Sequence, residues 1–174
     1  MLHDVSTTAK PRTGKTTAIK RLVTKLGTKN CIGFFTDEII ENGNRVGFQI
    51  NTLSGNQGIL AKVGLDSEIL IGRYGVNISK FEELCVPELN KAFLGDMDVD
   101  YIIIDEIGPI QMNSEHFKEL LLHLLSSEKT IIGTIFYETY PWIKEFKQKN
   151  GVNLIELTYE NREKIIDELL ERIQ

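Results

Sequence analysis

The sequence predicts an α/β protein in which a mostly parallel central sheet lies between two layers of helices, with one added antiparallel hairpin. Short apolar runs rich in β-branched residues alternate with longer segments whose apolar residues recur every three or four positions. Strands separated by helices need crossover connections and are therefore parallel. The dipeptide Asn42-Gly43 instead predicts a tight hairpin turn. We expect the 174 residues to form one three-layer domain.

In the first half, the expected elements are a strand at residues 5–8, a helix at 15–26, hairpin strands at 31–36 and 45–53, and a short strand at 59–63. The helix has apolar residues at helical spacing on one face, and Gly27 ends it. The strand at 5–8 contains β-branched residues but little apolar bulk, which is unusual for a buried parallel strand. Glycines at residues 72–77 predict a loop.

In the second half, the expected elements are helices at residues 79–93, 114–125, 140–149 and 159–173, and strands at 101–104, 130–135 and 152–157. Ser79 and Glu82 have the spacing of a capping box, and Pro87 predicts a kink. Pro141 suits the first turn of its helix, and Thr158 is expected to cap the last helix.

A phosphate-binding loop is predicted where the first strand meets the first helix, at Ala9-Lys10-Pro11-Arg12-Thr13-Gly14-Lys15-Thr16-Thr17. Backbone N–H groups of such a loop surround phosphate oxygens, and the start of the helix adds positive potential. We expect Lys15 to reach the outer phosphates and the Thr16 hydroxyl to bind Mg²⁺. A Lys/Thr-rich helix start without phosphate binding is the alternative.

Two acids follow the most apolar strand, and ligands of α/β sheets bind at the carboxyl ends of strands. We expect Asp105 to hold Mg²⁺, which commonly takes one or two carboxylates together with phosphates. Glu106 would orient or deprotonate the attacking water. The alternative is a pair of solvated acids at the end of a core strand.

Other polar residues at the ends of strands have two interpretations each. Thr134 can contact the γ-phosphate or simply occupy a strand, where threonine is favoured. Arg162 can face the nucleotide or be an exposed helix residue. Asp37 and Glu38 can line the pocket or begin a solvated hairpin.

Motifs along nearly the whole chain resemble those of the cancer-related nucleoside triphosphatases and their thermophile relatives. They are Gly14-Lys15-Thr16-Thr17, Gly33-Phe34-Phe35-Thr36-Asp37-Glu38, Ile104-Asp105-Glu106-Ile107-Gly108, Gly133-Thr134-Ile135, Leu157-Thr158-Tyr159-Glu160-Asn161-Arg162, and shorter motifs at 47–48, 52–55, 74–76 and 81–82. The resemblance implies a phosphate-loop fold and slow, Mg²⁺-dependent hydrolysis of ATP, GTP and other nucleoside triphosphates. It also implies roles for Thr134, Arg162 and Asn161 near the nucleotide.

The chain departs from this family in two places. The family has an apolar first strand and a glycine-rich loop, where this chain has Val5-Ser6-Thr7-Thr8 and then Ala9 to Thr13. The family often continues its Asp-Glu-Ile-Gly motif with Lys-Met-Glu, here replaced by Pro109-Ile110-Gln111. We expect the loop to be less preorganised than a glycine-rich one.

Two rival functions stay open at this stage. A nucleotide or nucleoside kinase usually has an arginine-rich lid, whereas the six arginines here are scattered along the chain. A nucleotide-binding regulatory module with little turnover could have a guanine-reading Asn-Lys-x-Asp motif, but the run Asn90-Lys91-Ala92-Phe93 lacks the aspartate.

Composition and charge indicate which partners and which location to expect for this protein. A net charge of −5 argues against a general nucleic-acid binder. Neither a signal-peptide pattern nor an apolar run long enough to cross a membrane is found, so we expect a cytoplasmic protein. Cys31 and Cys85 are expected to be reduced core residues. The sequence leaves the oligomeric state open, with a monomer as the simplest expectation.

Overall fold

The computed structural model describes residues 4–8, 13–95, 98–138, 140–149 and 152–173. Their helices and strands, in chain order, are β1 (Asp4–Thr8), α1 (Lys15–Leu26), β2 (Cys31–Glu41), β3 (Asn44–Thr52), β4 (Gln57–Val63), β5 (Leu70–Ile71), β6 (Tyr74–Val76), α2 (Ile78–Phe93), β7 (Tyr101–Ile107), α3 (Glu115–Leu125), β8 (Thr130–Ile135), α4 (Pro141–Lys147), β9 (Val152–Glu156) and α5 (Ile165–Ile173). Short 3₁₀ turns occupy Thr28–Asn30 and Gln111–Asn113.

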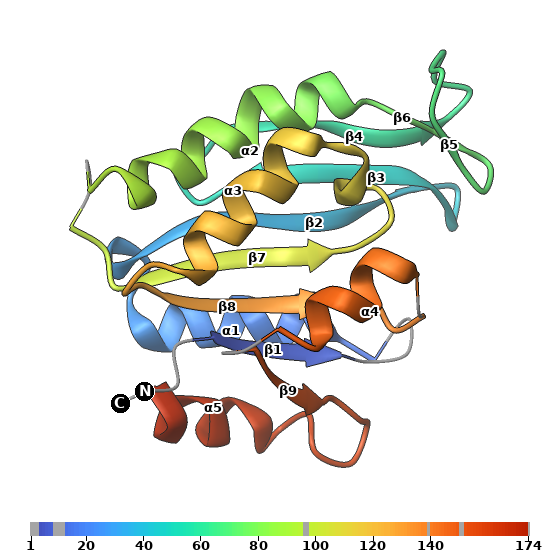
Figure 1. The fold of residues 1–174 in the computed structure, drawn as a ribbon. Coiled ribbons are helices and arrows are strands. Elements are labelled where there is room, and N and C mark those ends of the chain that lie inside the picture. The colour runs from blue at the N-terminus through green and yellow to red at the C-terminus, as the bar shows by residue number, and fades with distance from the viewer. Residues whose placement is uncertain (1–3, 9–12, 96–97, 139, 150–151, 174) are drawn as a thin grey trace.

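The described strands form one curled sheet in the order β5-β6-β4-β3-β2-β7-β8-β1-β9 (Figure 1). From β2 to β9 the neighbouring strands are parallel, whereas from β2 to β5 they are antiparallel. The expectation of a mostly parallel sheet was therefore wrong, and the sheet is mixed. The chain leaves β2 through turns rather than helices, and tight turns can join only antiparallel strands.

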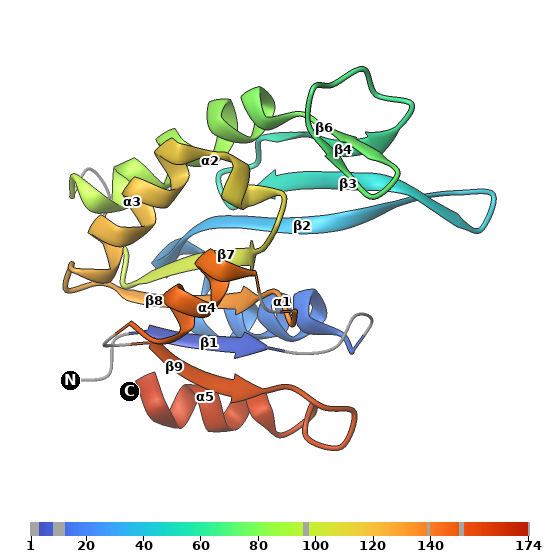
Figure 2. The ribbon, with the colours of Figure 1, turned by 45° about the vertical axis from the view of Figure 1, so that its right-hand side comes forward.

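Helices cover both faces of this sheet. Figures 1 and 2 show α2, α3 and α4 on one face, and α1 and α5 on the other. Each helical layer buries its own apolar cluster against the strands. The expected arrangement of helices on both faces of an α/β sheet is confirmed.

Aromatic side chains pack between the sheet and the helices α2 and α3. Phe34 of β2, Phe81 of α2 and Phe117 of α3 are fully buried and make edge-to-face contacts, with ring centroids 5.2 to 6.1 Å apart. Such pairs contribute beyond the area that they bury. On the opposite face, Leu22 of α1 and Ile165 of α5 are equally buried.

Several helices and strands begin or end at other residues than predicted. Residues 72–77 contain β6 rather than only a loop, because Tyr74 to Val76 pair with β4. Asn77, not Ser79, caps α2, and its side chain accepts a hydrogen bond from the Lys80 backbone N–H at 3.0 Å. The last helix begins at Ile165 instead of residue 159.

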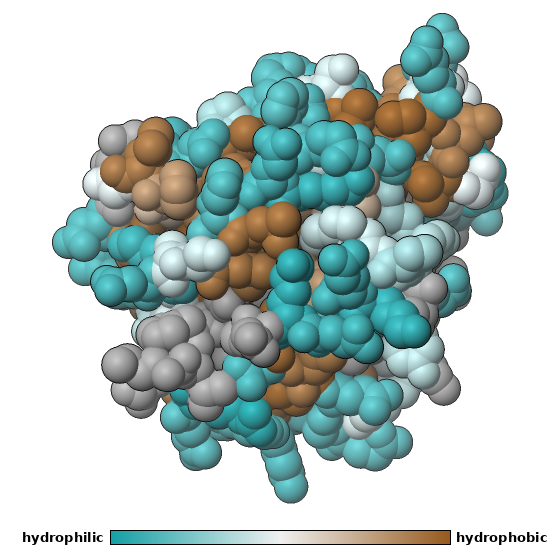
Figure 3. Space-filling model, in the orientation of Figure 1, coloured by the Kyte–Doolittle hydropathy of each residue, from teal (hydrophilic) through white to brown (hydrophobic). Residues whose placement is uncertain are grey.

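The cysteine prediction is confirmed, since Cys31 and Cys85 are both described, buried and outside any disulfide. Among the described residues, no helix is both long and apolar enough to span a bilayer. Figure 3 shows hydrophilic side chains over most of one face, with smaller apolar patches between them.

Gly33 allows β2 to pair closely with β7. Its φ is +130°, and a Cβ atom here would lie 1.9 Å from the Ile103 carbonyl oxygen. We predict that Gly33→Ala lowers the free energy of unfolding by about 3 kcal/mol or more, because strain and a backbone clash combine. Urea denaturation measures this loss.

Gly64→Ala is the matched control, since Gly64 also has positive φ, at +77°, but faces open space. Backbone strain alone should cost this variant about 1–2 kcal/mol. Equal losses in the two variants would contradict the clash at Gly33.

Candidate active site

The start of α1 meets the carboxyl ends of β7 and β8 at one edge of the sheet (Figure 1). Gly14, the residue before α1, has φ of +92°, a conformation that glycine adopts without strain. Its carbonyl accepts the Ala18 N–H at 2.9 Å, which begins the helix with Lys15 in its first turn. Of the predicted phosphate loop, Ala9, Lys10, Pro11 and Arg12 lie outside the described residues. Thr13 is buried, whereas Thr17 is exposed.

Lys15 and Glu106 form an ion pair across this edge. The Lys15 Nζ lies 2.9 Å from Glu106 Oε2, and the two side chains are 14% and 24% exposed. A partly buried pair is less screened by salt than a surface pair. The first residue of α1 and the penultimate residue of β7 are therefore held together by charge.

Asp105 is the buried centre of the site. Its side chain is 1% exposed, and its Oδ2 accepts a hydrogen bond from the Thr16 hydroxyl at 2.6 Å. Its Oδ1 accepts a second hydrogen bond from the Thr134 hydroxyl on β8. The Asp105 backbone carbonyl accepts from the Thr36 hydroxyl on β2 at 2.7 Å. One acidic residue thus connects α1, β8 and β2.

Burial raises the pKa of Asp105 from its ordinary 3.8 to about 6. The hydroxyl groups of Thr134 and Thr16 and the charge of Lys15 act in the opposite direction, whereas the Glu106 carboxylate raises the pKa further. A divalent cation beside Asp105 would favour its charged form. A cation here would therefore offset part of the burial that raises this pKa.

The oxygen donors at this edge fit Mg²⁺. Mg²⁺ prefers oxygen ligands and commonly uses one or two carboxylates together with substrate phosphates and water. Asp105 and Thr16 supply a carboxylate and a hydroxyl in direct contact. Within the described residues there is no cluster of three or more His, Cys, Asp or Glu side chains for a metal cage. The donor set suits a cation that is shared with phosphates.

Arg162 and Asn161 belong to the loop between β9 and α5. The Arg162 guanidinium lies over the Tyr159 ring, 5.9 Å from its centroid, and 3.8 Å from Glu163. Its side chain is 52% exposed. The Asn161 side chain accepts from the Thr158 N–H at 2.8 Å and donates to the Glu156 carbonyl at 2.7 Å. These contacts organise the loop and do not bring either residue to Asp105.

Asp37 forms an ion pair with α1, and Glu38 forms one within the β2–β3 hairpin. Both Asp37 carboxylate oxygens lie 2.7 Å from the Lys20 Nζ. Glu38 Oε1 lies 2.5 Å from Arg45. Glu38 thus pairs within the hairpin, whereas Asp37 pairs with the helix that carries Lys15 and Thr16, and a role for either in lining a pocket stays a prediction.

Lys147 was not singled out from the sequence. This last residue of α4 donates to the backbone carbonyls of Phe136 at 3.0 Å and Tyr137 at 3.4 Å, directly after β8. Its pKa is lowered, first by burial and then by the positive charge of Lys15. Lys15 and Lys147 are 132 positions apart in the sequence, so only the fold brings these two lysines to the same end of the sheet.

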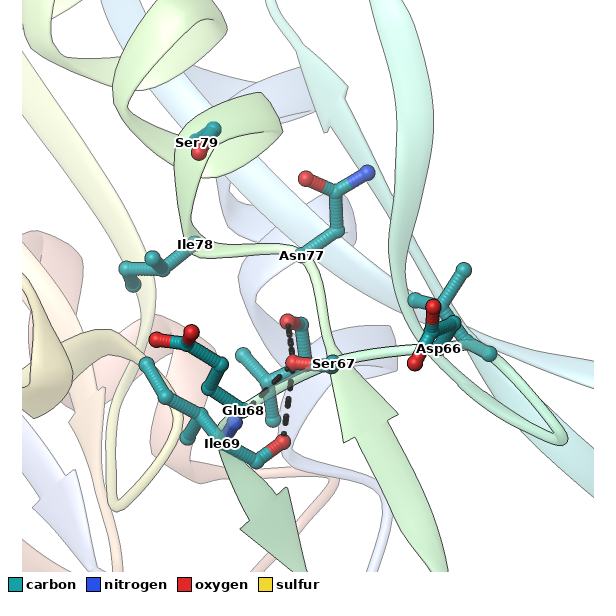
Figure 4. Close-up of a pocket in the computed structure, with 9 residues that line it drawn as sticks. Asp66, Ser67, Glu68, Ile69, Asn77, Ile78 and Ser79 are labelled. Atoms are coloured by element: carbon teal, nitrogen blue, oxygen red, sulfur yellow. Dashed lines mark hydrogen bonds between the residues drawn. The ribbon is translucent and has the colours of Figure 1, made fainter.

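A pocket of about 290 Å³ lies elsewhere, between the β4–β5 connection and the start of α2 (Figure 4). The Ser67 hydroxyl donates to the Val76 carbonyl at 2.6 Å and accepts from the Ile69 N–H at 3.1 Å. None of the predicted site residues lines this pocket. Its polar groups stabilise a loop, whereas the candidate site residues lie at the carboxyl ends of β7 and β8.

Fold and site together define a three-layer α/β protein with groups suited to binding phosphates and a metal ion at the carboxyl ends of its parallel strands. A lysine at a helix start, a buried aspartate with two hydroxyl donors and a second acid are gathered at the carboxyl edge of a sheet. Such edges bind ligands in α/β proteins, and helix starts bind phosphates.

The chain belongs to the NTPase family, whose sequence profile matches residues 4–170. A relative named nucleoside-triphosphatase THEP1, from Thermotoga sp. (strain RQ2), is 40% identical over 163 residues, covering 94% of this chain and 91% of the relative. The human relative named cancer-related nucleoside-triphosphatase is 32% identical over 186 residues, and the alignment covers 100% of this chain and 98% of the relative. The resemblance inferred from the motifs is confirmed.

Two solved structures of NTPase relatives have the same fold as this chain. The crystal structure of THEP1 from the hyperthermophile Aquifex aeolicus has a TM-score of 0.89 at 36% identity, covering 98% of this chain and 99% of that chain. The solution structure of a human cancer-related nucleoside triphosphatase has a TM-score of 0.84 at 31% identity, covering 99% and 97%. These relatives are hydrolases by name, and the chain is a member of the same enzyme family.

The Thr134–Asp105 hydrogen bond can be tested through its pH dependence. Because the folded pKa of Asp105 is raised, the folded state binds this proton more tightly, and stability from this group falls as pH rises between 3.8 and about 6. The Thr134 hydroxyl limits that fall by stabilising the carboxylate. Thr134→Val should lower the free energy of unfolding by about 1–3 kcal/mol at pH 8, and by less at pH 5.

Urea denaturation in a chelator at both pH values measures the difference. Thr134→Ser is the matched control, since it keeps the hydroxyl and should show the same small loss at both values. A Thr134→Val loss that does not change with pH would contradict the role of the hydroxyl.

Proposed function

We propose that this protein hydrolyses nucleoside triphosphates to the diphosphate and phosphate in a Mg²⁺-dependent reaction. One observation carries the proposal: the Lys15–Glu106 ion pair lies beside the Asp105–Thr16 hydrogen bond at the edge of the sheet. A phosphate-binding cation, a metal-binding carboxylate and a candidate base are thus gathered in one place. The names of the relatives support the same reaction.

We further propose that residues 9–17 form the phosphate loop of a RecA-like P-loop fold. The left-handed conformation of Gly14 at the start of α1 supports this assignment. In such a loop, backbone N–H groups and the lysine bind the β- and γ-phosphates. Lys15 would exchange part of its contact with Glu106 for phosphate oxygens.

Thr16 and Asp105 are the residues that would hold Mg²⁺. The bound ion supplies positive charge to the phosphate oxygens. Thr134 would keep the Asp105 carboxylate oriented, because its hydroxyl donates to Oδ1. Contact between the Thr134 hydroxyl and the γ-phosphate remains a prediction.

Glu106 is proposed to orient the attacking water and accept its proton. Positioning and charge stabilisation do most of the work in phosphoryl transfer, so a base need only hold water in line. The ion pair with Lys15, at 2.9 Å, holds the Glu106 side chain at the end of β7, where a water beside the phosphates would lie. Nucleotide contacts by Arg162 and Asn161 remain predictions, since both residues lie in the loop before α5.

The substrates proposed are ATP, GTP and other nucleoside triphosphates. The site described above consists of groups that recognise phosphates and a metal rather than a base. The cytoplasmic location, the monomeric state, the absence of a nucleic-acid partner and the single-domain organisation also remain predictions.

A phosphate-release assay across the common nucleoside triphosphates, with and without Mg²⁺, tests the proposal. We expect release without an added acceptor, which distinguishes hydrolysis from a kinase reaction. Lys15→Ala should abolish turnover and weaken triphosphate binding, because it removes the phosphate-binding charge. Unchanged hydrolysis in this variant would contradict the phosphate-loop assignment, and tight binding without release would indicate a regulatory module.

Glu106→Gln should separate binding from chemistry. The amide keeps the size of the side chain but removes the base, so hydrolysis should slow by about 10²–10⁴-fold. Triphosphate binding should be equal or tighter, because Lys15 loses its competing ion pair. Phosphate release and calorimetry measure the two effects.

Glu115→Gln is the matched control, since Glu115 lies at the start of α3 and pairs only locally, with Lys118 at 2.6 Å. It should keep the parent activity. Wild-type turnover in Glu106→Gln would assign Glu106 a structural role.

A further inference from the structure

The position of Lys147 is fixed by helix α4. Ile143 and Phe146 of this helix are buried in the core, and the Trp142 and Phe146 rings stack with centroids 5.2 Å apart. In Figures 1 and 2, α4 lies over the carboxyl-terminal half of β8. Because the helix is anchored by its apolar face, its last residue has a defined place at the edge of the sheet.

The Lys147 ammonium is held where β7 and β8 end. It donates to the carbonyls of Phe136 and Tyr137, two and three residues after Thr134. The Phe136 N–H in turn donates to the Ile107 carbonyl at 3.0 Å, one residue after Glu106. Lys147 therefore contacts the segment that directly follows β8, while the candidate base and the threonine that binds Asp105 lie at the ends of β7 and β8.

Two lysines thus converge on this edge from opposite faces of the sheet. Lys15 comes from α1 on one face, and Lys147 comes from α4 on the other. Their charges interact closely enough that Lys15 lowers the pKa of Lys147. Two like charges repel, and a polyanion between them would attract both and offset that repulsion.

We propose that Lys147 is a second phosphate-binding cation, which contacts the terminal phosphate of a bound nucleoside triphosphate. This inference rests on the function proposed above. An ammonium has three N–H donors, so it can take a phosphate oxygen in addition to the two carbonyls. The terminal phosphate is chosen because the Phe136 carbonyl that Lys147 contacts belongs to a residue hydrogen-bonded to Ile107, the neighbour of Glu106, where water would attack.

The role would be to stabilise charge that develops during hydrolysis. A positioned cation acts most strongly where charge appears in the transition state, and it needs little reorganisation when it is already held. Lys147 meets this condition, because α4 and two carbonyls hold it. It would also distinguish triphosphates from diphosphates, which lack the group that it contacts.

Lys147→Met tests the proposal in two measurements. Phosphate release at saturating Mg²⁺ should show kcat lowered about 10²-fold, as for loss of one preorganised donor. Calorimetry should show weaker binding of a non-hydrolysable Mg²⁺-triphosphate analogue, with binding of Mg²⁺-ADP unchanged. Lys147→Arg should recover part of both losses, because it restores the charge.

Lys144→Met is the matched control, because Lys144 lies one turn earlier on α4 and is exposed. It should behave as the parent protein in every assay. Should Lys147→Met fail to fold, Lys147→Gln keeps an amide donor for the two carbonyls while removing the charge, and the same losses are expected.

The outcomes separate the two proposals. If Lys147→Met and Lys144→Met have the same kcat and the same ratio of triphosphate to diphosphate affinity, Lys147 is not a phosphate ligand. An equal loss for both nucleotides would also overturn contact with the terminal phosphate. If the parent protein releases no phosphate from any triphosphate, the proposed hydrolysis fails, while the affinity ratio still decides the role of Lys147.

Discussion

The hydrogen bonds of the buried Asp105 carboxylate are the interaction on which the site depends. Burying a charged group is costly unless it is hydrogen-bonded, and two hydroxyls meet that need here. Thr16 comes from the first turn of α1 and Thr134 from β8, so the start of a helix and the end of a strand are fixed relative to each other. Thr36 extends the connection to β2 through the Asp105 carbonyl. The site is thus built as part of the fold.

Much of the fold could be predicted from periodicity and turn chemistry. The helix at residues 15–26 and the strand at 130–135 have the bounds expected for them. The extent of the antiparallel half was missed because β5 and β6, of two and three residues, are too short to show strand periodicity. The late start of α5 was missed because Asn161 and Thr158 resemble a helix cap, while their side chains hold a turn instead.

The proximity of some candidate site residues could be predicted from the strands, and that of others could not. Asp105, Glu106 and Thr134 lie near the carboxyl ends of two apolar strands that are neighbours in the sheet, so the sheet brings their backbone positions to one edge. Lys147 lies in the last turn of a short helix, where a lysine is commonly found because its charge interacts favourably with the helix dipole. Its position in the sequence therefore gives no sign of a functional role. Its proximity to Lys15 depends on how α4 packs, which is a tertiary property. Sequence patterns report the faces of elements, not the places where their ends meet.

The mixed sheet has a parallel half and an antiparallel half, and the candidate site residues are not spread evenly between them. Lys15, Thr16, Asp105, Glu106 and Thr134 lie on α1, β7 and β8, all of which belong to the parallel half or its helices. The antiparallel strands from β3 to β6 are joined to that half through β2. A loop that changes in length between β2 and β3 would therefore alter the outline of the protein without moving the strand ends. The antiparallel half is the part of this architecture in which insertions can accumulate while the reaction chemistry stays the same.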